Sequence, residues 1–392
     1  MSVWLVEPLD PLIARDGRPA SVGGHLSTIS FPYPSMLAGA VRTRMGCENG
    51  AFTLRGDALK ELLEKVIVRG PLLAEMQPEA DEVVQWLVPA PRDLTILRVL
   101  EGTTVLKRHV PRRLDPGEAM DSLGEKGLLP VGFQGEEAYG KPPKNLPAFW
   151  CWAEFENWLI APADRQGVDL GALGIAPLPI EIRAHLAVQP GERVGMDGML
   201  FQTSGLRFLQ TGSSPLNPRR FALSVRCQGA VVGGRELALE RQIAPLGGER
   251  RLARWAPSSK AWPRIPEVVR ERIVATGRAR LILLTPAVFA NGALPGWNGG
   301  AWPLAARIQA LVRAACVPRP AIVSGWDLAK GRPKETKRLA PAGSVYFLEL
   351  RGEKDDLRQW CEETWLNCVS DIAQDRRDGF GMAALGIWED TP

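Results

Sequence analysis

Histidine and tyrosine are scarce in this sequence, with three of each among 392 residues. The histidines, His25, His109 and His185, lie far apart, and Cys361 and Cys368 fall on the apolar stripe of an expected helix. A zinc site needs Cys and His ligands at short, characteristic spacings. The sequence contains no such pattern, and we expect neither a metal nor any other cofactor.

Long apolar segments are also missing. The longest uncharged apolar stretch, residues 281–290, is broken by a proline and is far shorter than the roughly 20 residues that cross a bilayer. The first ten residues carry Glu7 and Asp10 and no basic region, whereas a secretory signal begins with one. The six cysteines are scattered along the chain. We therefore expect a cytoplasmic protein with reduced thiols and no membrane association.

Charge of one sign is not in large excess, because 48 Lys and Arg residues stand against 44 Asp and Glu residues, a net charge of +4. A histone-like or membrane-surface protein carries a much stronger basic excess. Any nucleic-acid surface must therefore be local. Glycine and proline are abundant, with 40 and 33 residues, which indicates many turns and long connections.

Motifs for common enzymes are absent or incomplete. Residues 135–141 have the glycine-lysine spacing of a phosphate-binding loop, but Pro142 stands where a Ser or Thr hydroxyl is needed for magnesium. Gly379, Gly381 and Gly386 lack the dinucleotide-binding spacing, and too few residues follow them. The chain has no Gly-x-Ser-x-Gly or His-Glu-x-x-His motif. We expect a protein that is not an enzyme.

Hydrophobic periodicity predicts an α+β fold with helices on one face of a sheet. A helix is expected to begin with Ser35 as its N-cap and to end at Gly46. The other expected elements are strands at 2–6, 66–73, 83–88, 221–227, 279–284 and 345–350, helices at 57–66 and 355–373, and irregular zones at 111–147 and 177–218.

Four clusters combine basic side chains with flexible or glycine-rich backbone. They are Arg15 and Arg18 around Gly17; Lys107, Arg108, His109, Arg112 and Arg113; Arg250 and Arg251 after Gly247 and Gly248; and Lys330, Arg332, Lys334, Lys337 and Arg338. Backbone N–H groups and guanidinium forks bind phosphates together. Four such clusters in a chain of low net charge favour a segregated nucleic-acid surface.

Blocks of residues along the chain resemble a known family. Residues 7–19, EPLDPLIARDGRP, followed by residues 32–43, PYPSMLAGAVRT, are similar to the start of the third subunit of the Cmr complex, the type III-B CRISPR effector. Further similar blocks lie at 70–71, 89–94, 197–200, 246–250, 324–327 and 341–347. The segment 379–386 resembles the glycine-rich loop of the RAMP superfamily of RNA-binding proteins. Ala20 departs from the pattern, which has an aromatic residue at this position.

The resemblance implies two ferredoxin-like (RRM-like) folds with large loop insertions, an N-terminal domain at 1–165 and a C-terminal domain at 166–392. It implies a non-catalytic subunit that holds the 5′ tag of the CRISPR RNA (crRNA) in antiviral defence. Its partners would be the large palm-domain subunit and the backbone subunit, and it would meet target RNA only through the complex. Backbone amides, Arg and Lys side chains and stacking surfaces suit such a single-stranded tag.

The residues expected at the RNA come from the basic clusters, the first helix and the glycine-rich segments. They are Arg15, Gly17, Arg18, His25, Ser35, Arg42, Lys107, Arg108, Arg112, Gly247, Gly248, Arg250, Arg251, Lys334, Arg338, Gly379, Gly381 and Gly386.

Two alternative functions remain open at this point. A metal-independent endoribonuclease, like the CRISPR-RNA-processing members of the same superfamily, would need an acid or base beside the scissile phosphate, and His25 is the best candidate. A scaffold that binds only proteins would use the Trp-rich segments 149–152 and 255–262 as its adhesive surfaces.

Overall fold

The chain folds into two compact units, each assembled from three stretches of sequence. Unit 1 comprises Met1–Val84, Pro177–Lys260 and Ile322–Lys337, and unit 2 comprises Gln85–Ala176, Ala261–Ala321 and Arg338–Pro392. The computed structural model describes residues 1–15, 28–99, 102–113, 127–133, 139–189, 191–210, 218–305, 307–324, 326–327, 332–333 and 335–389.

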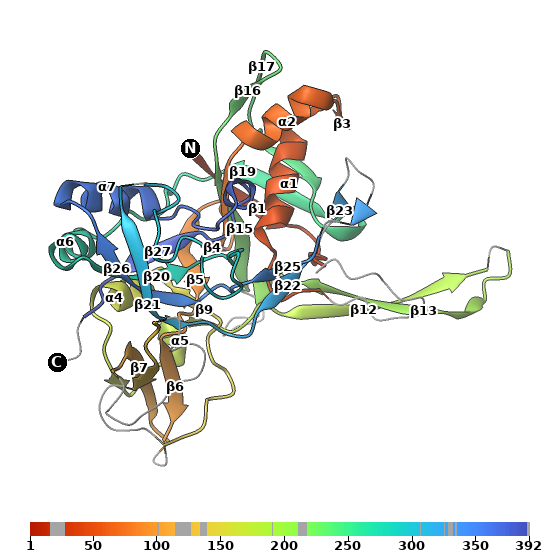
Figure 1. Ribbon diagram of the computed structural model, residues 1–392. Helices are drawn as coiled ribbons and strands as arrows, with labels where there is room; N and C mark the ends of the chain where they lie inside the picture. The colour runs from red at the N-terminus through yellow and green to blue at the C-terminus, as the bar shows by residue number, and fades with distance from the viewer. Residues whose placement is uncertain are drawn as a thin grey trace. The chain divides into compact units, whose positions relative to one another are not determined.

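An antiparallel sheet forms the centre of unit 1 (Figure 1). Five neighbouring strands of unit 1 follow one another in this sheet in the order β4, β15, β1, β19 and β18. If β1, β4, β15 and β19 are numbered 1 to 4 by their position in the sequence, their order across the sheet is 2-3-1-4. The bounds are β1 (Ser2–Pro8), β4 (Val68–Met76), β15 (Arg219–Cys227), β18 (Gln242–Pro245) and β19 (Leu252–Pro257).

The pairing of β1 with β15 and β19 explains why unit 1 is discontinuous. These two partners lie more than two hundred residues after β1, since Trp4 pairs with Val225 on one side and with Pro257 on the other. The units therefore divide the chain differently from the boundary at 165/166 that the sequence suggested, because residues beyond 166 complete the sheet that β1 begins.

Two helices connect β1 to β4. Helix α1 (Pro34–Met45) buries Leu37, Val41 and Met45, which recur every four residues, and α2 (Gly56–Lys65) buries Leu62. Gly46 is the C-cap of α1, as expected. The expected N-cap is wrong: Tyr33 is the N-cap, and Ser35 lies in the first turn because Pro34 already has helical geometry.

Residues 180–206 form a long two-stranded hairpin instead of the irregular zone expected there. Its strands are β12 (Ile180–Val188) and β13 (Gly195–Leu206), and they extend from unit 1 as a ribbon (Figure 1). Apolar and polar residues alternate along β12, so the ribbon has one apolar and one more polar face. The strand signal was present in this alternation.

Unit 2 contains a second antiparallel sheet, in the order β21, β26, β20 and β27. Counted along the chain, this order is again 2-3-1-4. The elements are α6 (Glu267–Thr276), β20 (Arg278–Leu283), β21 (Gln309–Cys316), β26 (Val345–Arg351), α7 (Lys354–Thr364), α8 (Ala373–Arg377) and β27 (Ala383–Gly386).

The final long helix is shorter than predicted. Helix α7 ends at Thr364, and α8 is a separate short helix. Leu366 has a φ of 52°, and its N–H donates to the carbonyl of Ala383. Cys368 forms a β-bridge with Met382. Pairing with residues close to the C-terminus therefore overrides the apolar helical spacing of this segment.

A buried ion pair anchors the core of unit 2. Asp93 and Arg280 are 0% and 2% exposed, and the Arg280 Nη1 to Asp93 Oδ2 distance is 2.5 Å. Trp158 Nε1 donates to Asp93 Oδ1 at 3.0 Å, and Arg280 Nε donates to the Ile387 carbonyl at 2.7 Å. Together these bonds tie β20 to segments far away in the sequence.

The remaining elements are short or belong to the insertions. They are β2 (Cys47–Glu48), β3 (Ala51–Phe52), β5 (Val83–Pro89), β6 (Leu94–Arg98), β7 (Thr104–Pro111), β8 (Val131–Phe133), β9 (Phe149–Cys151), α4 (Trp152–Ile160), β10 (Arg165–Gln166), α5 (Leu170–Leu173), β11 (Gly174–Ile175), β14 (Leu209–Gln210), β16 (Ala230–Val232), β17 (Arg235–Leu237), η1 (Gly248–Arg250), β22 (Ala321–Val323), β23 (Trp326–Asp327), β24 (Arg332–Pro333) and β25 (Lys337–Leu339). Helices and mostly antiparallel sheets confirm the predicted α+β class. In the described ranges, no helix has the length and apolar character needed to cross a membrane.

Candidate nucleic-acid interface

The loop that follows β1 in unit 1 is closed at its base by backbone pairing. Leu12 exchanges two hydrogen bonds of 2.8 Å with Leu206 at the base of the hairpin. Ala14 accepts from the Ile29 N–H at 2.8 Å and from the Thr28 hydroxyl at 3.0 Å. Arg15 follows this closure and is exposed. Three expected RNA contacts in the same loop, Gly17, Arg18 and His25, lie outside the described residues.

The Gly247–Arg251 turn packs directly against the start of this loop. Gly248 N–H donates to the Ile13 carbonyl at 2.8 Å. Gly247 has a φ of 75°, and a Cβ there would lie 2.6 Å from the Ile13 oxygen. A glycine is therefore required at 247, both for its backbone angle and for the close approach. The structure thus brings together two of the four basic clusters, around Arg15 and Arg250.

One cation of this turn, Arg251, faces the base of the β12–β13 hairpin. Arg251 donates to Glu249 Oε2 at 3.1 Å, while its Nε is buried without a hydrogen-bond partner among the described residues. A small cleft is lined by Pro11, Ile13, Glu181, Arg183, Thr203, Gly205 and Arg251. Arg250 is exposed, and Arg15 and Arg250 form no ion pair with any carboxylate in the described part of the chain. They are therefore available to an external anion.

The polar face of the hairpin continues this basic surface outward. The ring of His185 stacks on Phe201 with centroids 5.0 Å apart and an interplanar angle of 15°. His185 Nε2 is 2.8 Å from Thr203 Oγ1. Arg183 lies on the same face, two residues before His185, and pairs with Glu181 at 2.6 Å. Sequence reasoning missed Arg183, His185 and Phe201, although the alternation at 180–188 could have revealed the first two.

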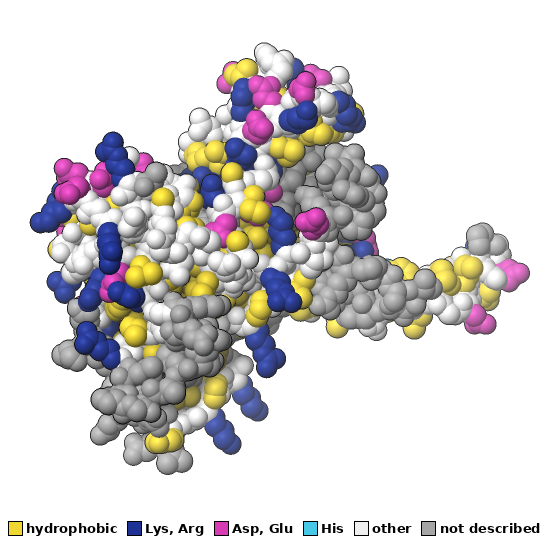
Figure 2. Space-filling model, in the orientation of Figure 1, with side chains coloured by type: hydrophobic (Ala, Val, Ile, Leu, Met, Phe, Trp, Pro, Cys, Tyr) yellow, Lys and Arg dark blue, Asp and Glu magenta, His cyan; other side chains and the backbone are white. Residues whose placement is uncertain are grey.

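The opposite face of the hairpin is apolar and exposed. Ile180, Ile182, Leu186 and Leu200 are each more than half exposed. Figure 2 shows hydrophobic side chains along this ribbon. The two faces of one hairpin therefore differ in chemistry, one with cationic and aromatic groups and the other with aliphatic side chains.

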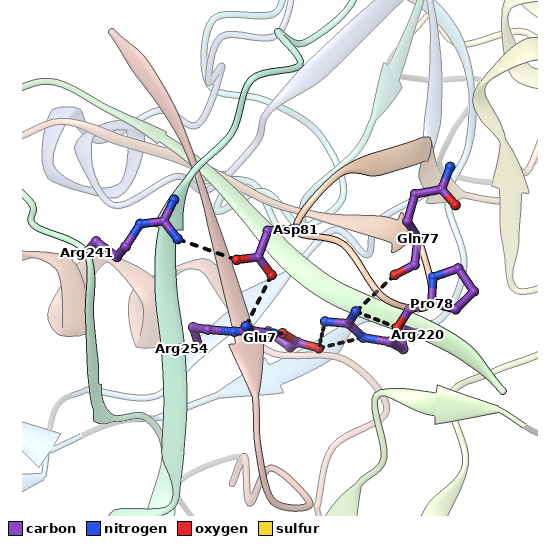
Figure 3. A network of polar contacts seen from close by, with 7 residues as sticks. All are labelled: Glu7, Gln77, Pro78, Asp81, Arg220, Arg241 and Arg254. Carbon is purple, nitrogen blue, oxygen red and sulfur yellow. Dashed lines mark hydrogen bonds and ion pairs between the residues drawn. The ribbon is translucent and has the colours of Figure 1, made fainter. Parts of the chain in front are cut away.

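A polar network fixes the strand ends from which the loop departs (Figure 3). Glu7 of β1 accepts from Arg220 of β15 at 2.7 Å and from Arg254 of β19 at 2.5 Å. Asp81 pairs with Arg254 at 3.2 Å and with Arg241 at 3.5 Å. The bonds to Glu7 raise the pKa of the Arg254 guanidinium. These arginines form ion pairs with Glu7 and Asp81 within the protein, so they hold the strands in place and do not add to the free basic surface.

Several expected RNA contacts are engaged within the protein. Lys107 pairs with Asp164 at 2.8 Å, and buried Arg108 donates to the Pro162 carbonyl at 2.8 Å. Burial lowers the pKa of Arg108. Arg42, 5% exposed, donates to the Val66 carbonyl at 2.9 Å. We therefore correct the assignment of Arg42 and Arg108, because groups buried on internal acceptors do not reach a phosphate.

The glycine-rich segment near the C-terminus is also a correction. Gly379, Gly381 and Gly386 are buried, and Gly386 belongs to β27. A Cβ at Gly381 would lie 2.8 Å from Ser370 Oγ, and one at Gly386 would lie 3.0 Å from Arg280 Nη2. These glycines permit close packing within unit 2 and do not form an exposed RNA loop.

The last expected contacts are scattered. Ser35 is half-buried in α1, Arg112 is exposed after β7, and Arg338 is exposed in β25. Lys334 lies outside the described residues. Within the ranges that the structure covers, no three His, Cys, Asp or Glu side chains gather as metal ligands.

Comparisons with known proteins place the chain in context. Residues 4–388 match the family described as CRISPR-associated protein (Cas_Cmr3). A chain in a structure titled "Cryo-EM structure of the Type III-B Cmr-beta bound to cognate target RNA and AMPPnP, state 1" is 13% identical with a TM-score of 0.43, covering 88% of this chain and 86% of that chain. A chain in the corresponding structure with cognate target RNA is 14% identical with a TM-score of 0.44 and the same coverage. No curated protein matches.

Proposed function

Because this chain belongs to the Cmr3 family of CRISPR-associated proteins, we propose that it is a non-catalytic RNA-binding subunit of a type III-B CRISPR effector complex. In this role it holds the 5′ tag of the crRNA and joins the large palm-domain subunit to the backbone subunit, in the cytoplasm. Target RNA reaches it only through the assembled complex.

One observation carries the RNA-binding part of the proposal. The loop at Arg15, the turn at Arg250 and the cationic base of the hairpin adjoin one another in unit 1 through bonds to Leu12, Ile13 and Ala14. On one face of the same hairpin, Arg183 lies two residues before His185, whose ring stacks on Phe201. Cations for phosphates and ring faces for bases are what a single-stranded RNA segment requires.

The strand order supports two ferredoxin-like folds. In each unit four antiparallel strands have the order 2-3-1-4, which is the ferredoxin-like order 4-1-3-2 read from the other edge. Unit 1 has its helices after the first strand, and unit 2 has α7 after the third, the two positions where a ferredoxin-like fold places helices. The other helix position of each unit is occupied by irregular chain and inserted strands.

The two-faced hairpin supports a role between RNA and protein. Its cationic and aromatic face suits the tag, while the aliphatic face with Ile182 and Leu186 carries no charge and suits an apolar surface of a neighbouring subunit. We propose that this hairpin lies at the junction of the crRNA and one of the two protein partners.

The direct test is a titration of the full chain with fluorescent RNA carrying the repeat-derived 5′ tag. The double variant Arg15→Glu and Arg250→Glu should weaken binding roughly tenfold or more, because two charge-assisted phosphate contacts become repulsive. The slope of log affinity against log salt should flatten by about 1.4, since each phosphate contact on a single strand contributes about 0.7.

The matched control is Lys60→Glu with Lys65→Glu on α2, which changes the net charge equally at exposed positions of the same unit. Equal affinities of the two folded double variants would refute the assigned interface. The same samples, incubated without other subunits, should leave the RNA intact; cleavage that disappears in His25→Ala would favour the endoribonuclease alternative.

A further inference from the structure

Unit 2 contains a large open cavity that the proposed function does not use. Its volume is about 1130 Å³, and the described residues that line it lie within the segments 98–99, 139–147 and 170–176. This volume is slightly above the roughly 300–1,000 Å³ of typical small-molecule cavities. A nucleotide or a short single-stranded segment therefore fits within it.

Three cationic side chains lie among the described residues of the wall. Arg98, Lys141 and Lys144 line the cavity, and none of the described residues that line it is an Asp or Glu. All three cations are exposed, and none forms an ion pair with a carboxylate in the described ranges. The nearby carboxylate of Asp169 caps α5 by accepting from the Gly171 N–H at 2.8 Å. The described part of the wall is therefore complementary to an anion.

Two of these cations are held side by side by the backbone. Arg98 N–H donates to the Lys141 carbonyl at 2.9 Å, and Lys141 N–H donates back to Arg98 at 3.2 Å, so the two residues are directly opposite in an antiparallel bridge. Residues opposite each other project to the same side, and like charges in this arrangement are destabilising. An anion bound between the two side chains would remove that repulsion.

A close backbone approach makes this pairing possible. A Cβ at Gly140 would lie 2.6 Å from the Arg98 carbonyl oxygen. Only glycine fits there without displacing the bridge. This accounts for the Gly140-Lys141 pair that gives the segment its resemblance to a phosphate-binding loop: the glycine permits the bridge, and the bridge directs the lysine.

The same wall also offers apolar and ring surfaces. Tyr139 is 78% exposed at the edge of the cavity, and the exposed Pro142 contributes a flat aliphatic face. The Asn145 side chain adds an amide donor and acceptor. Inorganic phosphate would use the cations alone, whereas a nucleobase can stack on a tyrosine ring and bond to an amide.

We propose that this cavity binds a nucleoside phosphate, with the phosphate between Arg98, Lys141 and Lys144 and the base stacked on Tyr139. The same chemistry is offered by a free mononucleotide and by an unpaired nucleotide within an RNA strand. The site lies in unit 2 and is separate from the tag interface proposed in unit 1.

The test measures binding of adenosine and uridine 5′-monophosphates to the full chain by isothermal titration calorimetry, with inorganic phosphate as a third probe. Lys141→Glu with Lys144→Glu should weaken nucleotide binding roughly tenfold or more. Tyr139→Ala should weaken it about 5- to 150-fold, the range expected for loss of one stacked base, without changing phosphate binding.

The matched control is Arg272→Glu with Lys354→Glu, exposed cations on α6 and α7 that do not line the cavity. Absence of mononucleotide binding below millimolar concentration, or equal affinities of the cavity and control variants, would overturn the proposal. So would phosphate and nucleotide binding with the same affinity and with no effect of Tyr139→Ala, since the base would then have no site.

Competition distinguishes the two sources of ligand. An oligouridine strand that displaces the mononucleotide identifies an RNA segment as the occupant, and a strand that leaves it bound identifies a free nucleotide. Mononucleotide binding should be unchanged in Arg15→Glu with Arg250→Glu. The tagged-RNA titration therefore tests the interface in unit 1, and mononucleotide calorimetry independently tests the cavity in unit 2.

Discussion

Removing the charge of Asp93 should destabilise unit 2 strongly. Asp93→Asn keeps the shape of the side chain and the acceptor for Trp158 Nε1, but it leaves the Arg280 guanidinium, 2% exposed, without a counter-charge. The new amide also turns N–H donors toward a group that can only donate. The perturbation is thus electrostatic and leaves no cavity.

The size of the effect follows from burial. Breaking a buried ion pair costs about 3–5 kcal/mol, whereas an exposed pair contributes about 0–1 kcal/mol. Arg280 retains its bond to the Ile387 carbonyl at 2.7 Å, which favours the lower end, about 3 kcal/mol. For a domain of roughly 200 residues this lowers Tm by about 6–12 °C.

Urea unfolding followed by tryptophan fluorescence and near-ultraviolet circular dichroism measures the loss, because Trp158 contacts the altered side chain. The control is Glu267→Gln, which neutralises an exposed partner of Arg270 on α6 and should cost at most about 1 kcal/mol. If Asp93→Asn also costs less than about 1 kcal/mol, the pair is not the anchor described above.

Two further predictions concern packing and pH. Gly381→Val should lower the free energy of unfolding in urea by about 3 kcal/mol or more, because φ at this position is 82° and the new Cβ would lie 2.8 Å from Ser370 Oγ. The RNA affinity of the folded fraction should stay unchanged. Lost RNA affinity with intact stability would restore the hypothesis that this segment is an RNA-binding loop. Burial lowers the pKa of His109, so protonation of its ring favours the unfolded chain. The stability that is present above pH ~6.5 should therefore be lost as the pH falls below that value. A urea unfolding midpoint that depends on pH equally in His109→Gln and in the unchanged protein would contradict this.

The elements that the sequence predicted well are those specified by neighbouring residues. Strand β1 appears where a short β-prone run precedes prolines, and α1 ends at Gly46, where a glycine follows the last apolar turn. The central strands β15, β20 and β26 coincide with apolar runs because burial on both faces leaves few polar positions. The α+β class and the family resemblance rest on these local patterns.

Which basic residues remain exposed without an internal counter-charge is decided only by the tertiary structure. Lys107 and Arg15 have the same chemistry in the sequence, yet Lys107 meets Asp164, a carboxylate 57 positions away, and Arg15 meets none in the described ranges. The buried glycines at 379–386 show the same dependence, since a glycine permits both an exposed loop and close packing against Ser370. Ion pairing and burial depend on partners that the fold brings together from distant segments, and local sequence carries no record of them.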